Sequence, residues 1–247
     1  MNLSESNRIL VAVPTYNERE NVRELCRRIL ESMPGVQILF IDDNSPDGTA
    51  AEIVRISADA PNVNLQLRHS KSGIGSAHKA AFREACLRDV EVLVTLDADL
   101  THNPEDIPKL IAALEFADVA VGSRFASGGG LQDWAITRQF VTKLGHFATR
   151  LLLQIPHDAT GALRAYRIGV ETRKISELPI SDGYPFFYQS MAWLIRKNIS
   201  VVEVPIVLTS RAYGSSKMKP RDVYLGIIGL FGFAIAHRLL FWLSDKR

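Results

Sequence analysis

The chain has 247 residues, 47% of them hydrophobic, so it can bury the core of one large domain, and this composition excludes a disordered protein. Two cysteines with no metal-ligand spacing around them exclude a disulfide scaffold and a zinc module. The formal net charge is +2, but residues 1–120 hold 12 basic and 19 acidic residues, whereas residues 121–247 hold 17 and 8.

This asymmetry predicts that the second half faces an anionic partner, such as phosphates or an anionic bilayer. Nucleic acid is not expected as a partner, because no recognisable nucleic-acid module is present. The first residues lack the apolar core of a signal peptide, which predicts a cytoplasmic N-terminus.

Short apolar runs alternate with helical patterns in the first half of the chain. Buried strands are expected at Ile9–Val13, Val36–Ile41, Val63–Arg68, Val90–Asp97 and Val119–Gly122. Helices are expected between them at Glu18–Met33, Gly48–Ala58, Gly75–Leu87 and Pro104–Leu114. This order predicts an α/β fold with a mostly parallel central sheet flanked by helices. The second half is less regular, with helices expected at Ile136–Leu152 and Phe186–Lys197 and a strand at Ser200–Leu208.

Polar side chains collect in the loops that follow three of these strands. The loops run from Pro14 to Glu20, from Asp42 to Thr49 and from Asp97 to Asp106. Ligands of parallel α/β sheets bind beyond the carboxyl ends of the strands, so all three loops are expected on one rim. Asp42 and Asp43 alone could equally be turn and cap residues.

Asp97 and Asp99 are harder to explain as turn residues. In an extended chain they share one face, and two carboxylates at about 7 Å or less repel unless a cation or a proton lies between them. A divalent metal that bridges them to a diphosphate explains the pair, and Mg²⁺ commonly takes one or two carboxylates together with phosphate oxygens.

The motifs VPTYNERENV, IDDNSPDGTA, GIGSAHKAAF, VTLDADLTHNPEDIP and GSRFASGG together resemble the inverting family 2 glycosyltransferases with the GT-A (Rossmann-like) fold. Within that family, DATGALRAYR, SDGYPFFYQ, VEVPI and RAYGSSKM resemble the dolichyl-phosphate and polyprenyl-phosphate mannosyltransferases. The match runs in order from about Val11 to Met218. It implies a catalytic domain over residues 1–220, followed by a membrane-associated helix over residues 221–247.

The resemblance also implies roles for individual residues. The nucleoside is expected at Pro14, Tyr16 and Glu18 with Asp42 or Asp43. Asp97 and Asp99 are expected to hold Mg²⁺ or Mn²⁺ and the diphosphate. The predicted catalytic and phosphate-facing residues are Asp99, Arg124, Arg211 and Lys217, and Arg138 is the basic residue ahead of a helix at the membrane interface. Three positions depart from relatives, Thr101 where some have a metal-touching glutamine, Gln189 where some have a glutamate, and His78 where the family has a tyrosine.

The implied reaction is inverting transfer of a sugar, most simply mannose from GDP-mannose, to dolichyl or undecaprenyl phosphate at the cytoplasmic face of a membrane. UDP-glucose or another donor, and a glycan hydroxyl acceptor, are the alternatives within the enzyme class. A non-catalytic nucleotide-sugar binder is a rival from another class. A phosphatase of the haloacid dehalogenase type would also fit Asp-x-Asp-x-Thr at Asp97, but that family places its acidic metal motif after this one.

Residues Val223–Ala236 form an uncharged run of 14 residues. That is short for a spanning helix, which needs roughly 20 apolar residues. The sequence therefore predicts a peripheral or shallowly embedded helix, with self-association of the chain through this helix as the alternative.

Overall fold

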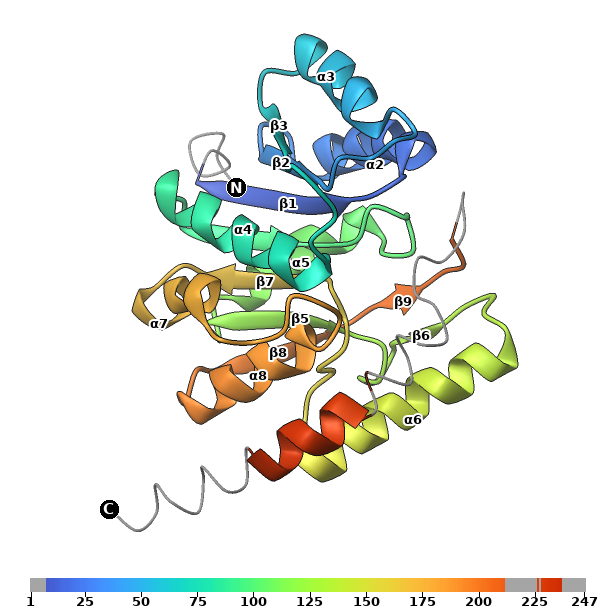
Figure 1. Cartoon of the computed structure of the whole chain (residues 1–247), viewed down its shortest axis with the longest axis vertical. Coiled ribbons are helices and arrows are strands. Elements are labelled where there is room, and N and C mark those ends of the chain that lie inside the picture. Colours follow the sequence, from blue (N-terminus) through green and yellow to red (C-terminus); the bar gives the residue numbers. More distant parts are fainter. Residues whose placement is uncertain (1–7, 212–225, 227, 237–247) are drawn as a thin grey trace.

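The computed structural model describes residues 8–211, 226 and 228–236. Figure 1 shows a central sheet with helices on both of its faces. The elements in chain order are β1 (Ile9–Thr15), α2 (Arg19–Ser32), β2 (Gln37–Asp42), α3 (Thr49–Asp59), β3 (Val63–Leu67), α4 (Ile74–Leu87), β4 (Val92–Thr95), η1 (Pro104–Asp106), α5 (Ile107–Ala113), β5 (Val119–Ser123), β6 (Gly130–Leu131), α6 (Ile136–Leu153), β7 (Arg164–Arg167), α7 (Val170–Arg173), η2 (Lys174–Glu177), α8 (Phe186–Arg196), β8 (Val201–Pro205) and β9 (Val207–Leu208).

The large sheet has seven strands in the order β3-β2-β1-β4-β7-β5-β8. The pairs β1 with β2, β1 with β4, β2 with β3 and β5 with β8 are parallel, which confirms the predicted fold class. Only β7 runs antiparallel to both of its neighbours. The sequence prediction missed β7, because a four-residue strand that begins and ends with arginine has no apolar run to mark it.

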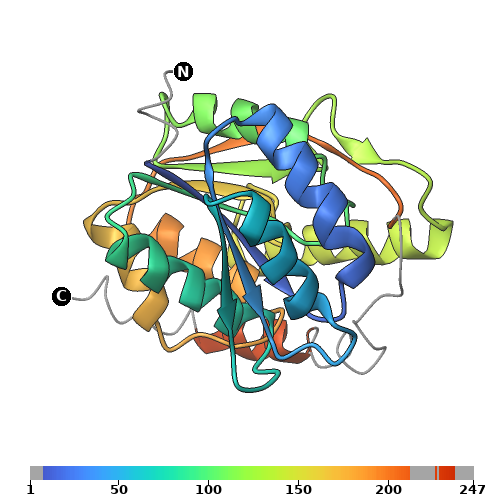
Figure 2. The same ribbon diagram turned by 90° about the horizontal axis from the view of Figure 1, so that it is seen from above.

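Side chains of each buried strand alternate between two hydrophobic clusters. Val11 and Val13 of β1 belong to one cluster, whereas Leu10 and Ala12 belong to the other. Residues of α2, α3 and α5 fill the first cluster, and residues of α4 and α8 fill the second. Figure 2, turned by 90°, shows the strands crossing between these helices. A sheet buried on both faces explains why its strands are nearly continuous in apolar residues.

The strand expected at Ser200–Leu208 is divided in two. β8 pairs with β5, and β9 pairs with β6 in a separate two-stranded sheet. Pro205, which has no N–H to donate, ends β8, and the chain then crosses to β6. This crossing carries the chain past the carboxyl edge of the large sheet to Arg211.

The helical residues near the C-terminus pack against the domain. Leu230 and Ala234 are buried in the second cluster, and the ring of Phe233 lies 5.8 Å from that of Tyr188 on α8. The rest of the predicted membrane-associated segment, residues 221–247, lies outside the described residues. Every helix in the described part of the chain is too short or too polar to cross a bilayer.

Candidate active site

The loops after β1, β2 and β4 meet at one edge of the sheet. β1 lies between β2 and β4 and runs parallel to both, so the carboxyl ends of the three strands are neighbours. The backbone joins the first two loops directly, because the N–H of Asp43 donates to the carbonyl of Thr15 at 3.1 Å. The predicted rim therefore exists, and it brings together side chains from distant parts of the sequence.

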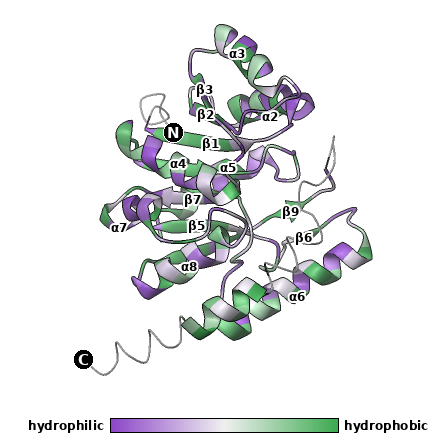
Figure 3. Ribbon diagram, in the orientation of Figure 1, coloured by the Kyte–Doolittle hydropathy of each residue, from purple (hydrophilic) through white to green (hydrophobic). Residues whose placement is uncertain are grey.

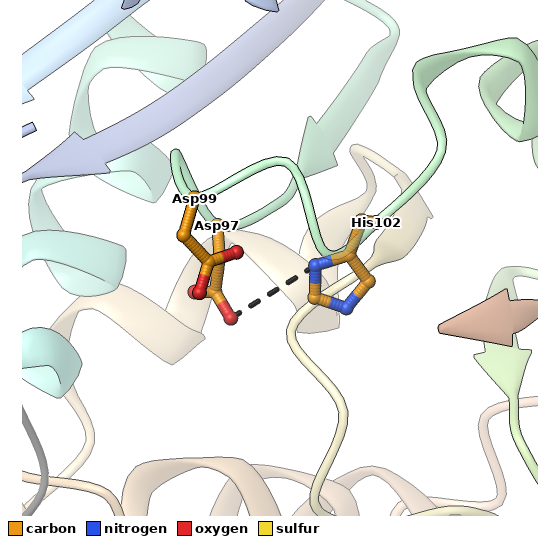
Figure 4. A group of neighbouring side chains, drawn as sticks. All are labelled: Asp97, Asp99 and His102. Carbon is orange, nitrogen blue, oxygen red and sulfur yellow. Dashed lines mark ion pairs between the residues drawn. The ribbon is translucent and has the colours of Figure 1, made fainter. Parts of the chain in front are cut away.

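Three side chains from the loop after β4 converge in a group that could hold a metal ion. Asp97, Asp99 and His102 each offer one ligand atom, and these atoms all lie within 4.8 Å of one another (Figure 4). Leu100 adopts a left-handed backbone conformation with φ of 60°. Non-glycine residues rarely do so, and such strain is concentrated at functional sites. The resulting tight turn brings His102 back toward the two carboxylates.

Thr101 supports this turn. Its backbone N–H and its hydroxyl both donate to Oδ1 of Asp99, at 3.1 and 2.7 Å. The hydroxyl therefore orients the carboxylate. His102 is the residue of this loop that presents a nitrogen toward the carboxylate pair.

Burial and neighbouring charges shift the pKa values of the side chains in this group. Loss of contact with water, and then the neighbouring Asp99 carboxylate, raise the pKa of Asp97 well above its ordinary range. Burial lowers the pKa of His102 well below its ordinary value, so this imidazole is neutral at pH 7. A repelling carboxylate pair beside a neutral imidazole is a donor set suited to a divalent cation.

Arg211 reaches the same carboxylates from the end of the strand crossing. Its Nη2 donates to Oδ2 of Asp99 at 2.6 Å, and its Nη1 donates to Oε1 of the buried Glu18 at 3.2 Å. Both oxygens of Asp99 thus have protein partners, Thr101 on one side and Arg211 on the other. A divalent cation held by this group would compete with the Arg211 guanidinium for Oδ2 of Asp99.

Arg138, on the first turn of α6, lies within electrostatic reach of Asp99 and Arg211, and burial is the main cause that lowers the pKa of its guanidinium. Its guanidinium stacks on the ring of Trp134, 3.7 Å from the ring centre, and the Trp134 Nε1 donates to the carbonyl of Thr209 at 2.7 Å. This places the start of α6 beside the carboxylate group.

Arg124 follows β5 and is held by a buried carboxylate. Its Nε and Nη2 donate to the two oxygens of Asp158 at 2.8 and 2.7 Å, and the Asp158 backbone N–H donates to Glu203. Burial alone would raise the pKa of Asp158, but the ion pair with Arg124 and the N–H of Thr160 outweigh it and lower this pKa to about 2. These two hydrogen bonds to one carboxylate fix the orientation of the Arg124 guanidinium plane.

Replacing Asp158 by asparagine should therefore destabilise the fold. Breaking a buried ion pair by removing one partner costs roughly 3–5 kcal/mol, which urea unfolding at pH 7 would measure. The pKa of Asp158 is lower in the folded chain than in the unfolded one, so its contribution is complete above the unfolded pKa, about 4, and is lost as the pH falls toward about 2. The difference in the free energy of unfolding between wild type and Asp158→Asn should shrink over that range.

The exposed Asp59, changed to asparagine, is the control, and equal stability of the wild type and Asp158→Asn would contradict the assignment.

The proposed nucleoside residues lie along the first two loops, with Pro14 buried in β1 and Tyr16 half-buried after it. Asp42 is fully buried, and its carboxylate accepts hydrogen bonds from the hydroxyl of Thr15 and from the backbone N–H and hydroxyl of Ser45. These bonds are turn chemistry, which was the alternative interpretation for this residue.

Asp43 has a different surrounding. Oδ1 lies 2.9 Å from Nη1 of Arg68, and Oδ2 accepts the N–H of Ser72 at 3.1 Å. Burial is the main cause that raises the pKa of this carboxyl group. The Lys71 ammonium lies 4.0 Å from the centre of the Tyr16 ring, so the loop after β3 closes over the rim next to Asp43.

Two residues considered from sequence, Gln189 and His78, do not join the group. Gln189 accepts the N–H of Ser181 at 2.7 Å, which is a structural contact. His78 is buried between the rings of Phe186 and Phe187 in the second cluster. Lys217 lies outside the described residues. Sequence reasoning missed His102 and Asp158, and the only local signal for His102 was its position three residues after Asp99.

Residues 10–172 match the family described as Glycosyl transferase family 2. The chain is 38% identical to the polyprenol monophosphomannose synthase of Mycolicibacterium smegmatis, over 95% of this chain and 89% of that protein. It is 34% identical to the undecaprenyl-phosphate mannosyltransferase of Micrococcus luteus, over 94% and 96%. It is 36% identical to the dolichol-phosphate mannosyltransferase of Pyrococcus furiosus, over 88% of this chain and 61% of that protein.

Among solved structures, glucosyl-3-phosphoglycerate synthase from Mycobacterium tuberculosis in complex with UDP superimposes with a TM-score of 0.62, covering 93% of this chain and 82% of that one. The sequence identity is 17%, so the likeness concerns the fold, which is of the GT-A kind. The same protein has been solved with Mn²⁺, UDP and glucosyl-3-phosphoglycerate, with a TM-score of 0.62 over 94% of this chain and 85% of that one at 16% identity.

Proposed function

Because this chain belongs to glycosyl transferase family 2, we propose that it transfers mannose from GDP-mannose to a polyprenyl phosphate, dolichyl or undecaprenyl, with inversion at the anomeric carbon. Three relatives with 34–38% identity support this. One is named for the synthesis of polyprenol monophosphomannose, and the other two are named as mannosyltransferases for undecaprenyl phosphate and dolichol phosphate. The observation that carries the proposal is the carboxylate group Asp97 and Asp99 with the guanidinium of Arg211 on one of its oxygens. Such a site can bind a metal ion and phosphate groups together.

The chemistry asks for positioning more than for proton transfer. A lipid monophosphate has a second pKa of about 6, so near neutral pH it is already an oxyanion and needs no general base. A divalent cation, Mg²⁺ or Mn²⁺, would supply charge for the departing nucleotide diphosphate when it is bound at Asp97 and Asp99. A single in-line displacement by the phosphate oxygen then inverts the anomeric centre.

The chain's own residues divide the remaining tasks. Asp43, beside Tyr16 and the loop after β3, is assigned to the nucleoside together with Pro14, Glu18 and Asp42. Arg124, oriented by Asp158, is assigned to the sugar or the phosphates. Arg211 and Lys217 are assigned to the acceptor phosphate, with Arg138 near Arg211. Arginine presents paired N–H donors that match phosphate oxygens, which suits these assignments.

The direct test is product analysis. Purified protein is incubated with GDP-mannose, UDP-glucose and other nucleotide sugars, each with a polyprenyl phosphate, and the lipid products are weighed by mass spectrometry. We expect a product heavier by one hexose with GDP-mannose alone. A product from UDP-glucose would correct the donor, and hexose transfer to a glycan hydroxyl would correct the acceptor. Nucleotide-sugar binding without any product would indicate a non-catalytic binder.

An acceptor that stays in a bilayer requires a site at the membrane surface. The exposed side chains of α6 suit binding to such a surface. The outer side of this helix exposes an apolar stripe at three- and four-residue spacing, and Figure 3 shows hydrophobic segments alternating with hydrophilic ones along α6. The stripe consists of Ile136, Phe140, Leu144, Phe147 and Leu151, each 51–84% exposed. The sequence from 134 to 157 contains no acidic residue but holds Arg138, Lys143 and Arg150. An apolar stripe with basic flanks fits an anionic lipid surface.

Changing Phe140 and Phe147 together to aspartate should weaken binding to vesicles that contain anionic lipid by at least about tenfold, because each buried phenylalanine contributes about 1.5–3 kcal/mol. Co-sedimentation with vesicles measures this. Transfer to a short, water-soluble polyprenyl phosphate should persist. Phe116→Asp is the matched control, because Phe116 is 80% exposed in the turn that follows α5. A change of oligomeric state with vesicle binding intact would mean that α6 serves self-association.

Association of residues 221–247 with the membrane, at its cytoplasmic face, stays a prediction. Truncation after Pro220 should release the protein into the soluble fraction and depress transfer to long polyprenyl phosphates more than to a short analogue. Equal loss with both acceptors would mean that the segment supports the fold. Leu230 and Ala234 are buried in the second cluster, so thermal melting of the truncated chain is the necessary companion measurement.

A further inference from the structure

His102 is a buried side chain with one unused nitrogen. It is 3% exposed, and among the described residues its Nδ1 has no hydrogen-bond partner. The nearest acidic oxygen is Oδ2 of Asp97, and the dashed line in Figure 4 joins the two atoms. Their distance of 3.9 Å is too long for a hydrogen bond. A buried polar atom without a partner costs free energy, so its presence in this loop calls for a ligand.

The other buried histidine of the domain provides a comparison. His78 also has an unpartnered nitrogen among the described residues, but it is packed against the rings of Phe186 and Phe187. Its surroundings are apolar and contain no carboxylate pair, so its role is packing. The Nδ1 of His102 instead faces Asp97 and Asp99, with all three ligand atoms within 4.8 Å.

The geometry suits a six-coordinate cation after a small closure. With metal–ligand distances of about 2.1 Å, neighbouring ligand atoms lie about 3 Å apart and opposite ones about 4.2 Å apart. The separations of 3.9 Å from Asp97 and of up to 4.8 Å within the group are nearer to the distance between opposite ligands than to that between neighbours, so side-chain shifts bring the three atoms onto one ion.

We propose that His102 is the third protein ligand of the divalent cation and that its nitrogen makes the site prefer Mn²⁺ to Mg²⁺. Mg²⁺ is bound through oxygen and keeps its waters, whereas first-row transition ions accept imidazole nitrogen readily. Two carboxylates alone would hold either ion. The inference rests on the metal-dependent reaction proposed above and adds to it the identity of the ion.

The test of coordination uses the untagged full chain with Mn²⁺. Pulsed electron paramagnetic resonance should show one strongly coupled nitrogen, and the coupling should change with histidine labelled by ¹⁵N. The signal should vanish in His102→Asn and also in the double variant Asp97→Asn with Asp99→Asn, which excludes manganese bound at another histidine. If His102→Asn fails to fold, the double variant still shows whether the coupled manganese lies at the carboxylate pair. Bound Mn²⁺ without nitrogen coupling in the wild type would overturn the proposal.

The test of preference measures affinities for both ions by competition. The wild type should favour Mn²⁺ by at least about tenfold, and His102→Asn should lose at least about tenfold in Mn²⁺ affinity, the scale of loss seen when metal-site residues are changed. Mg²⁺ affinity should stay within about threefold, because asparagine offers an oxygen in place of the nitrogen. His78→Asn is the matched control for the removal of a buried imidazole. Equal loss of both ions in His102→Asn would refute the preference.

These measurements do not involve sugar transfer. A chain that shows nitrogen coupling but makes no mannosylated lipid would refute the proposed function and keep the ligand assignment. A chain that makes the lipid product but shows no coupling would do the reverse.

Discussion

Asp99→Ala and Asp97→Ala should each lower the turnover of sugar transfer by about a hundred- to a thousandfold, because the leaving diphosphate loses its counter-ion, and loss of one electrostatic contact of this kind costs about 10²–10³ in kcat. Single-turnover assays with saturating donor and acceptor would measure the loss. Asp89→Asn is the control, since this aspartate is 90% exposed in its side chain and its φ of 49° is tolerated by asparagine.

The same pair should separate activity from stability. The Asp97 carboxylate is held next to that of Asp99, so Asp97→Asn removes repulsion and should raise the melting temperature of the metal-free protein while abolishing turnover. Chelation of metal should mimic the loss of turnover in the wild type. Wild-type turnover in metal-free buffer would rule out the metal assignment.

Arg211→Gln should change metal binding and transfer in opposite directions. Oδ2 of Asp99 receives the Arg211 guanidinium at 2.6 Å, and a hydrogen bond to a charged group is worth about 1.5–3 kcal/mol, so freeing this oxygen should strengthen Mn²⁺ binding by about tenfold. Turnover should nevertheless fall, by about a hundredfold, because the acceptor phosphate loses a bidentate partner. Titration with Mn²⁺ and separate KM values for donor and lipid phosphate would measure both effects.

Arg173→Gln is the matched control, because Arg173 is a half-exposed arginine on the surface helix α7. The KM for the lipid phosphate should rise more than the KM for the nucleotide sugar. Loss of nucleotide-sugar affinity alone would show that Arg211 serves the donor, and unchanged Mn²⁺ affinity would show that it does not compete with the cation. Lys217→Ala, predicted from sequence to act with Arg211, belongs in the same assay.

Local sequence patterns were sufficient for most of the framework. The apolar runs at β1, β2, β3 and β5, the helices between them and the rim of strand-end loops appear where they were predicted. A buried strand or an amphipathic helix reveals itself through the spacing of its own side chains, so neighbouring residues are enough to recognise it. β7 escaped because its evidence is its pairing with β4 and β5, which no short window contains.

The sequence by itself predicted Asp97 and Asp99 as a metal pair, because two carboxylates two residues apart after a strand repel unless a cation or a proton lies between them. Only the tertiary structure decided which other groups meet them. His102 reaches the pair through the left-handed turn at Leu100, and Arg211 contacts Glu18 across 193 residues of sequence. Contacts of that range depend on how strands and crossings stack in space, and on which side chains lose water there, and no local periodicity encodes either.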